Sequence, residues 1–126
     1  GVFCATREHV LSRREDLQTF LDGHPLHFLY GGEHAYTLDE YVEAIVSAGL
    51  RIERVIGPFQ SVINYAPMSL AEFESVLATR LRRILGAPAA RQVARMPSAR
   101  TAFGWWRTVR DQTPGRHYSF LAAKPR

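Results

Sequence analysis

Apolar residues recur at helical spacing most regularly between Thr37 and Gly49. Thr37 is a favoured N-cap residue, and Glu40 stands three positions later as its capping-box partner. Gly49 is a favoured C-terminal stop, because glycine adopts the left-handed conformation without strain. The pattern predicts an amphipathic helix whose apolar stripe consists of Leu38, Tyr41, Val42, Ile45 and Val46.

Two further capping boxes predict two more helices. Ser12 and Glu15 precede a short apolar stripe, which indicates a helix of about ten residues. Ser69 and Glu72 precede a longer stripe that ends at Gly86. The apolar positions of this longer helix are Leu70, Phe73, Leu77, Leu81 and Ile84.

Three segments have the composition of β-strands. Residues 1–6, GVFCAT, form an apolar run that ends abruptly at the polar residues 7–9. This pattern is typical of a buried strand whose C-terminal end emerges into polar surroundings. Residues 50–57 are rich in β-branched side chains, and residues 116–124 follow a Pro-Gly turn, so we expect strands in both segments.

The order of these elements predicts an α/β fold, with helices packed on a mostly parallel sheet and a right-handed crossover between the first two strands. We expect three strands, the last of them antiparallel and inserted between the first and the second. The chain is then a single domain with an α/β core of residues 1–57 and 116–126 and a helical insertion of residues 58–115. Within this insertion, residues 99–111 form the last helix.

Composition limits the class of protein. The 126 residues, 46% of them apolar, are enough for one ordinary domain. The chain has neither a run of about 18 apolar residues nor an N-terminal signal peptide, so we expect a cytoplasmic protein with no membrane partner. The single Cys4 excludes an internal disulfide, and its apolar neighbours predict a buried thiol.

Charge is distributed unevenly along the chain. Residues 1–63 carry 5 Lys and Arg against 9 Asp and Glu, whereas residues 64–126 carry 11 against 3. The basic half suits an acidic partner such as nucleic acid or a phosphorylated substrate, or it is simply a solvated arginine-rich helix face. Trp105 and Trp106, with arginines beside them, suit either base stacking or a helical core.

The segment before the Thr37 helix is dense in hydrogen-bonding side chains around the pair Gly31-Gly32. These glycines permit motion, so the segment is either a lid over a substrate or a rigid structural loop. The residues concerned are His24, His27, Tyr30, Glu33, His34 and Tyr36. The spacing of the histidines and Glu33 matches no known metal motif, so we expect no metal.

The polar end of the opening strand is the strongest candidate site, because ligands of open α/β sheets bind beyond the carboxyl ends of parallel strands. Glu8 and His9 are candidate general bases for a hydroxyl or amine, and Arg7 is a candidate substrate-binding residue. The alternative is that Arg7 and Glu8 form an ion pair with each other or with helix ends. Asn64, in the loop after the second strand, is a further substrate-binding candidate.

Four stretches form a recognisable combination: the opening strand, the helix ending SAGLRIERV, the stop Gly57-Pro58 and the closing YSFLAAKP. Together they resemble the C-terminal half of a class I S-adenosylmethionine-dependent methyltransferase. In that family, an antiparallel seventh strand inserts between the fifth and the sixth. The resemblance covers residues 1–10, 37–57 and 116–126. The stretches REHV, HPLH and YGGEHAYTLDEY are similar to sequences of a bacterial subgroup of the family.

The resemblance implies a Rossmann-like sheet and a parent enzyme that transfers a methyl group from S-adenosylmethionine to an unidentified, most simply small-molecule, acceptor. The family's glycine-rich cofactor half is absent, so we expect a fragment that is inactive alone. Its first strand then exposes an edge that favours self-association. The alternative function is a non-enzymatic basic module that binds nucleic acid or another acidic partner.

Overall fold

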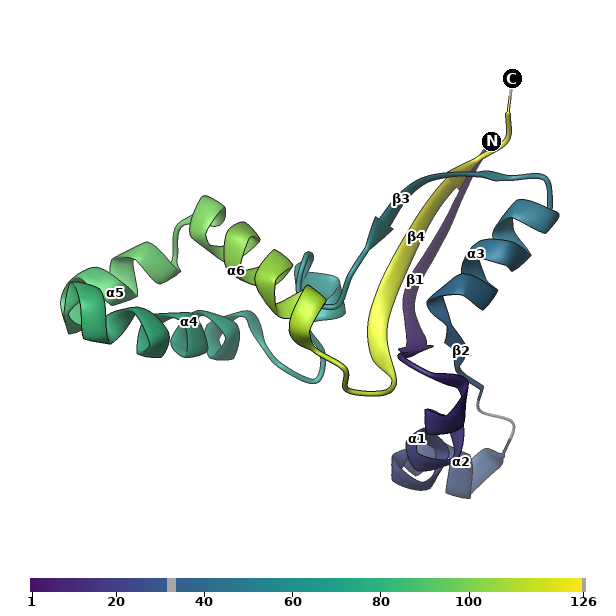
Figure 1. Ribbon diagram of the computed structural model, residues 1–126, viewed down its shortest axis with the longest axis horizontal. Coiled ribbons are helices and arrows are strands. Elements are labelled where there is room, and N and C mark those ends of the chain that lie inside the picture. Colours follow the sequence, from purple (N-terminus) through teal and green to yellow (C-terminus); the bar gives the residue numbers. More distant parts are fainter. Residues whose placement is uncertain (32–33, 126) are drawn as a thin grey trace. The chain divides into compact units, whose positions relative to one another are not determined.

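The computed structural model describes residues 1–31 and 34–125. The chain separates into two compact units (Figure 1). The sheet unit consists of Gly1–Ile56 and the segment from Gln112 onward, and the helical unit consists of Gly57–Asp111. The fold is α/β, with an open mixed sheet and six α-helices in the described residues.

The sheet has four strands in the order β2-β1-β4-β3. Their bounds are Val2–Leu11 for β1, Tyr36–Thr37 for β2, Arg51–Ile56 for β3 and Arg116–Ala123 for β4. Strand β4 is antiparallel to both β1 and β3, and β2 is parallel to β1. The predicted order of the three long strands is confirmed, whereas the predicted number is wrong. Strand β2 has two residues, too few to show a pattern in the sequence.

Strand β1 does not end before the polar residues 7–9, as the sequence suggested. It pairs with β4 as far as Val10, and a bulge between Ala5 and Glu8 shifts the register. Arg7 lies in this bulge with a φ of 62°. Because the backbone ladder continues through the bulge, the charged residues stay within the strand and do not emerge beyond it.

The core of the sheet unit lies between the sheet and α3 (Leu38–Ser47). Its buried residues are Val10, Ile45, Phe120 and Ala122. The predicted capping box is present: the Glu40 amide donates to Thr37 Oγ1 at 3.4 Å, and the Thr37 amide donates to Glu40 Oε2 at 2.8 Å. Such a cap stabilises a helix by about 1 kcal/mol.

The segment after β1 differs from the prediction. It forms a 3-10 turn, Arg14–Asp16, followed by α1 (Leu17–Gly23) and α2 (Pro25–Tyr30). The capping box predicted at Ser12 is wrong, because the Ser12 hydroxyl donates to the Gln112 carbonyl oxygen at 3.2 Å instead of capping a helix. The prediction of a buried Cys4 is also wrong, since the residue is exposed.

The helical unit contains a 3-10 turn, Val62–Asn64, and the helices α4 (Leu70–Leu85), α5 (Ala87–Ala94) and α6 (Pro97–Arg110). The Ser69–Glu72 capping box is present at the start of α4. The buried core is largely aromatic and consists of Phe59, Tyr65, Phe73, Leu77, Ala94 and Phe103. The predicted α4 stripe fails at Ile84, which is 81% exposed.

Gly104 explains how α6 packs in this unit. It is buried, and a Cβ atom at this position would overlap the Phe59 carbonyl oxygen. Glycine weakens a helix interior, yet here its missing side chain lets α6 approach the backbone at Phe59.

Candidate functional site

Two histidines and Phe20 lie around the ring of His9 near the carboxyl end of β1. The ring centroid of His9 lies 4.5 Å from that of His117, 5.0 Å from that of Phe20 and 5.2 Å from that of His24. His9 and His117 are direct partners across β1 and β4, so their side chains share one face of the sheet. Phe20 belongs to α1, and His24 follows it. We call His9, His24, His117 and Phe20 the histidine cluster.

Hydrogen bonding fixes the tautomer of His9. Its Nδ1 lies 2.7 Å from the Gly115 carbonyl oxygen, which can only accept, so Nδ1 is the donor. Nε2 of the neutral ring therefore keeps a lone pair. The Nδ1 atoms of His24 and His117 are buried and have no hydrogen-bond partner among the described residues. The cluster thus offers imidazole nitrogens that the fold itself does not use.

The surroundings of His117 keep its ring neutral. Burial lowers the pKa of His117 to about 4, and its electrostatic interactions with His9, Arg7, Arg116 and His24 act in the same direction. His117 is therefore neutral at physiological pH. A neutral imidazole is suited to accept a hydrogen bond from a ligand group.

A small cavity adjoins the cluster. Its volume is about 210 Å³, and its lining residues are Thr19, Phe20, Gly23, His24 and Pro114. Gly115 helps to form this region, because a Cβ atom there would overlap the Phe20 ring. The volume is below the range of roughly 300 to 1,000 Å³ that is usual for a whole ligand, so the cavity suits one small group of a larger molecule.

The two catalytic candidates, Glu8 and His9, face opposite sides of the sheet, because they are consecutive residues in a regular part of β1. Glu8 lies on the side of α3. There, burial raises the pKa of Tyr41 to about 12, and the negative charge of Glu8 acts in the same direction. The Tyr41 hydroxyl donates to the His9 carbonyl oxygen at 3.3 Å. One acceptor therefore cannot lie directly against both candidate bases.

A second cavity lies on the α3 side of the sheet unit. Its volume is about 650 Å³, and its lining residues are Arg14, Tyr36, Glu40, Tyr41, Glu43, Ala44 and Ser47. Among the substrate-binding candidates, Tyr36 lines this cavity, and His34 stacks on Tyr36 with ring centroids 6.0 Å apart. The candidates therefore divide into two groups, one at each face of the sheet.

The remaining candidates join neither group. Arg7 is exposed, and its backbone amide donates to Ser119 Oγ at 3.4 Å. Tyr30 is 83% exposed on α2, where the half-buried His27 lies beside Phe28. Asn64 belongs to the helical unit, where it is buried and its Nδ2 donates to the Gly57 carbonyl oxygen at 3.1 Å. Glu33 lies outside the described residues.

Residues 1–31 and 34–125 contain neither a cluster of metal-ligating side chains nor a membrane-spanning helix. No group of three or more His, Cys, Asp or Glu side chains is placed there to hold a metal ion. None of the helices in these ranges is both long enough and apolar enough to cross a bilayer.

Comparisons with protein-family models, with curated proteins and with solved structures found no match for this chain. The relation to methyltransferases therefore stays a prediction from the sequence.

The sequence pattern does not identify Phe20, His117 or Tyr41 as candidates. His117 joins the site only through its pairing with His9, and that register depends on the bulge in β1. A polar residue at the start of the closing strand was the one available signal. Tyr41 belongs to the predicted apolar stripe of α3, yet its hydroxyl makes a polar contact with β1.

Proposed function

We propose that this chain is the substrate-side part of an S-adenosylmethionine-dependent methyltransferase that acts on a small-molecule acceptor. The observation that supports the proposal is the position of β4, which is antiparallel and lies between β1 and β3. The sequence resemblance implies this order for the fifth, seventh and sixth strands. Because β1 and β3 both run antiparallel to β4, they are parallel to each other, as the resemblance requires.

The described residues do not fit S-adenosylmethionine by themselves. Gly31 ends α2, with its amide donating to the His27 carbonyl oxygen, and does not open a helix after a strand. A glycine-rich turn at the end of a strand is the feature that would cradle such a cofactor. We therefore assign cofactor binding to a part of the parent protein outside this chain.

In this proposal, His9 has the chemical role of a base. A hydroxyl or amine acceptor must lose a proton when it is methylated, and His9 Nε2 keeps a lone pair because Nδ1 donates to Gly115. The small cavity beside His24 holds part of the acceptor, and the neutral His117 lines the same face. Glu8 lies on the other face, beside Tyr41, and therefore does not contact an acceptor that is held against His9.

Cofactor binding by a longer polypeptide, which includes the residues encoded before Gly1, is the test of the proposal. We expect a strand and a glycine-rich turn in that region, and binding of S-adenosylmethionine by calorimetry to the longer polypeptide but not to the 126-residue chain. Transfer of a labelled methyl group to a small-molecule extract is the second measurement. An unrelated preceding domain, or a longer polypeptide that does not bind the cofactor, contradicts the proposal.

The alternative function is nucleic-acid binding by the helical unit, and its charge favours it. The unit has eight arginines against three acidic residues, a net charge of +5. Trp106 favours it less, because the guanidinium groups of Arg80 and Arg110 each lie 4.8 Å from its ring, whereas Trp105 is 60% exposed. A salt titration separates the two functions, since phosphate-backbone binding weakens steeply as salt rises.

A further inference from the structure

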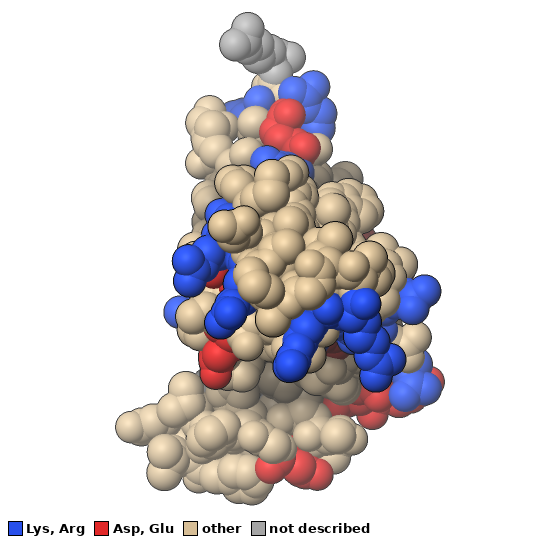
Figure 2. Space-filling view, turned by 90° about the vertical axis from the view of Figure 1, so that its left-hand side faces the viewer, with Lys and Arg blue, Asp and Glu red and all other residues tan. Residues whose placement is uncertain are grey.

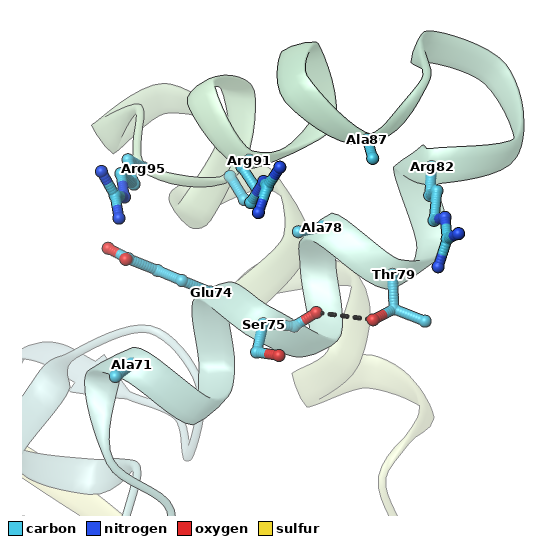
Figure 3. A pocket seen from close by; sticks show the side chains of 10 residues that line it. Ala71, Glu74, Ser75, Ala78, Thr79, Arg82, Ala87, Arg91 and Arg95 are labelled. Atoms are coloured by element: carbon cyan, nitrogen blue, oxygen red, sulfur yellow. Dashed lines mark hydrogen bonds between the residues drawn. The ribbon is translucent and has the colours of Figure 1, made fainter.

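A groove between α4 and α5 carries three arginines around a surface of small side chains (Figure 3). Its volume is about 470 Å³, within the range of roughly 300 to 1,000 Å³ that is usual for small-molecule sites. Arg82 comes from α4, and Arg91 and Arg95 come from α5. Ser75 and Ala78 belong to the α4 wall.

The three guanidinium groups are not neutralised within the unit. Arg82, Arg91 and Arg95 are exposed and have no ion-pair partner among the residues that the structure describes. The acidic side chain of the groove, Glu74, forms an ion pair with Arg100 at 3.1 Å. The groove lining therefore has three positive charges and one negative charge, and that negative charge is already partly compensated.

The groove lies in a basic unit, because six of the eight arginines of the helical unit are exposed. Figure 2 shows several Lys and Arg side chains in blue on the surface that faces the viewer. Within the groove, Ala87 is the first residue of α5, so the electropositive N-terminal end of that helix lies at the edge. Small side chains leave room for a ligand, and planar guanidinium groups donate paired hydrogen bonds to phosphate oxygens.

We infer that the groove between α4 and α5 binds a small molecule that carries phosphate groups. A net charge of about +2 in the lining matches a dianionic group, and the volume matches a molecule of metabolite size rather than a polymer. This inference concerns the helical unit alone and does not rest on the proposed methyltransferase function.

Isothermal titration of inorganic pyrophosphate into the 126-residue chain is the primary test. We expect saturable binding at one site, because the arginines surround a single groove. Arg91→Ala should weaken binding by about ten-fold or more. Ser75→Glu places a carboxylate on the α4 wall without harming the helix, and it should remove binding.

Arg83→Ala is the matched control. Arg83 is an exposed arginine on the same helix as Arg82 and does not line the groove, so its loss should change affinity by less than about two-fold. Circular dichroism of each variant establishes that it is folded. Arg91→Lys keeps the charge but not the planar donor, and it should bind less tightly than the unchanged chain.

Four results would overturn the inference. They are no saturable binding of pyrophosphate, equal losses for Arg83→Ala and Arg91→Ala, tighter binding of citrate than of pyrophosphate, and binding only of a single-stranded oligonucleotide with a steep salt dependence. The second indicates diffuse charge, the third a carboxylate ligand, and the fourth a nucleic-acid surface.

Discussion

The sheet unit and the helical unit present their polar groups in different ways. The sheet unit has a net charge of −1 and brings half-buried histidines together across β1, β4 and α1. The helical unit has a net charge of +5 and carries most of its arginines on the surface around an aromatic core. The first arrangement perturbs the pKa of a group such as His117. The second leaves arginine side chains exposed, where they can bind an anion.

The exposure of the charged groups determines how each unit can bind a ligand. Solvent screens exposed charges and weakens each pairwise interaction, so the helical unit needs several arginines around one groove. Burial strengthens the electrostatic interactions of each group, so the sheet unit can act through one or two imidazoles.

Removal of one core ring from each unit should be the most damaging change. Phe73 is 0% exposed in the helical unit, and Phe120 is 1% exposed in the sheet unit. Phe73→Ala and Phe120→Ala should each lower the free energy of unfolding by about 3 to 5 kcal/mol, measured by urea titration. A loss below about 1 kcal/mol in either variant would show that the ring is not packed in the core of that unit.

Substitution of the two candidate bases should separate the faces of the sheet. In the parent enzyme, His9→Ala should lower turnover by about 10² to 10⁴-fold, because general-base catalysis is lost. Glu8→Gln should have the smaller effect, since Glu8 faces α3. Affinity for S-adenosylmethionine, measured by calorimetry, should stay unchanged in both variants. Normal turnover in His9→Ala, or a larger loss in Glu8→Gln, would move the acceptor away from the histidine cluster.

Gly104→Ala should destabilise the helical unit despite the better helix propensity of alanine. The added methyl group overlaps the Phe59 carbonyl oxygen, so the expected cost is about 1 to 3 kcal/mol. Thr101→Ala, at an exposed position of the same helix, is the control and should be nearly neutral. Thermal unfolding of both variants gives the comparison, and a stabilised Gly104→Ala would refute the close packing.

The pH dependence of stability should reveal the lowered pKa of His117. Its pKa is about 4 in the folded protein and 6.5 as an ordinary value, so the unfolded chain binds more protons between these limits. Stability should therefore fall as the pH drops from about 6.5 to about 4 and should not change further from this cause below pH 4. Because His117 is partly solvated, the loss is only about 1 kcal/mol. His117→Gln should flatten this part of the curve, measured by urea unfolding at several pH values.

Local signals in the sequence predicted the elements that depend on local contacts. The Thr37–Glu40 and Ser69–Glu72 capping boxes form as predicted, because both partners lie within one turn. Ser12 has the same spacing to Glu15, yet its hydroxyl bonds to Gln112, one hundred positions along the chain. A capping motif therefore fails where a distant segment offers the side chain a better partner.

The candidate site was less predictable for a related reason. His9 was identified from its place after an apolar run, but its partners His24 and His117 are joined to it by strand register and by the path of α1. The bulge between Ala5 and Glu8 sets that register, and nothing in the composition of β1 indicates a bulge there. The resemblance to a family supplied the strand order, which periodicity alone does not determine.

Cys4 gives the molecule a chemical reporter of its own. It is the single cysteine of the chain, it is exposed, and it stands opposite Leu121 of β4. On the other side of β1, the described pairing with β2 involves only Val10 and Leu11. The rate at which a maleimide reacts with this thiol should therefore slow when another strand docks along that edge, whether it comes from a second copy or from the rest of a parent protein. Alkylation kinetics can thus follow assembly without any engineered label.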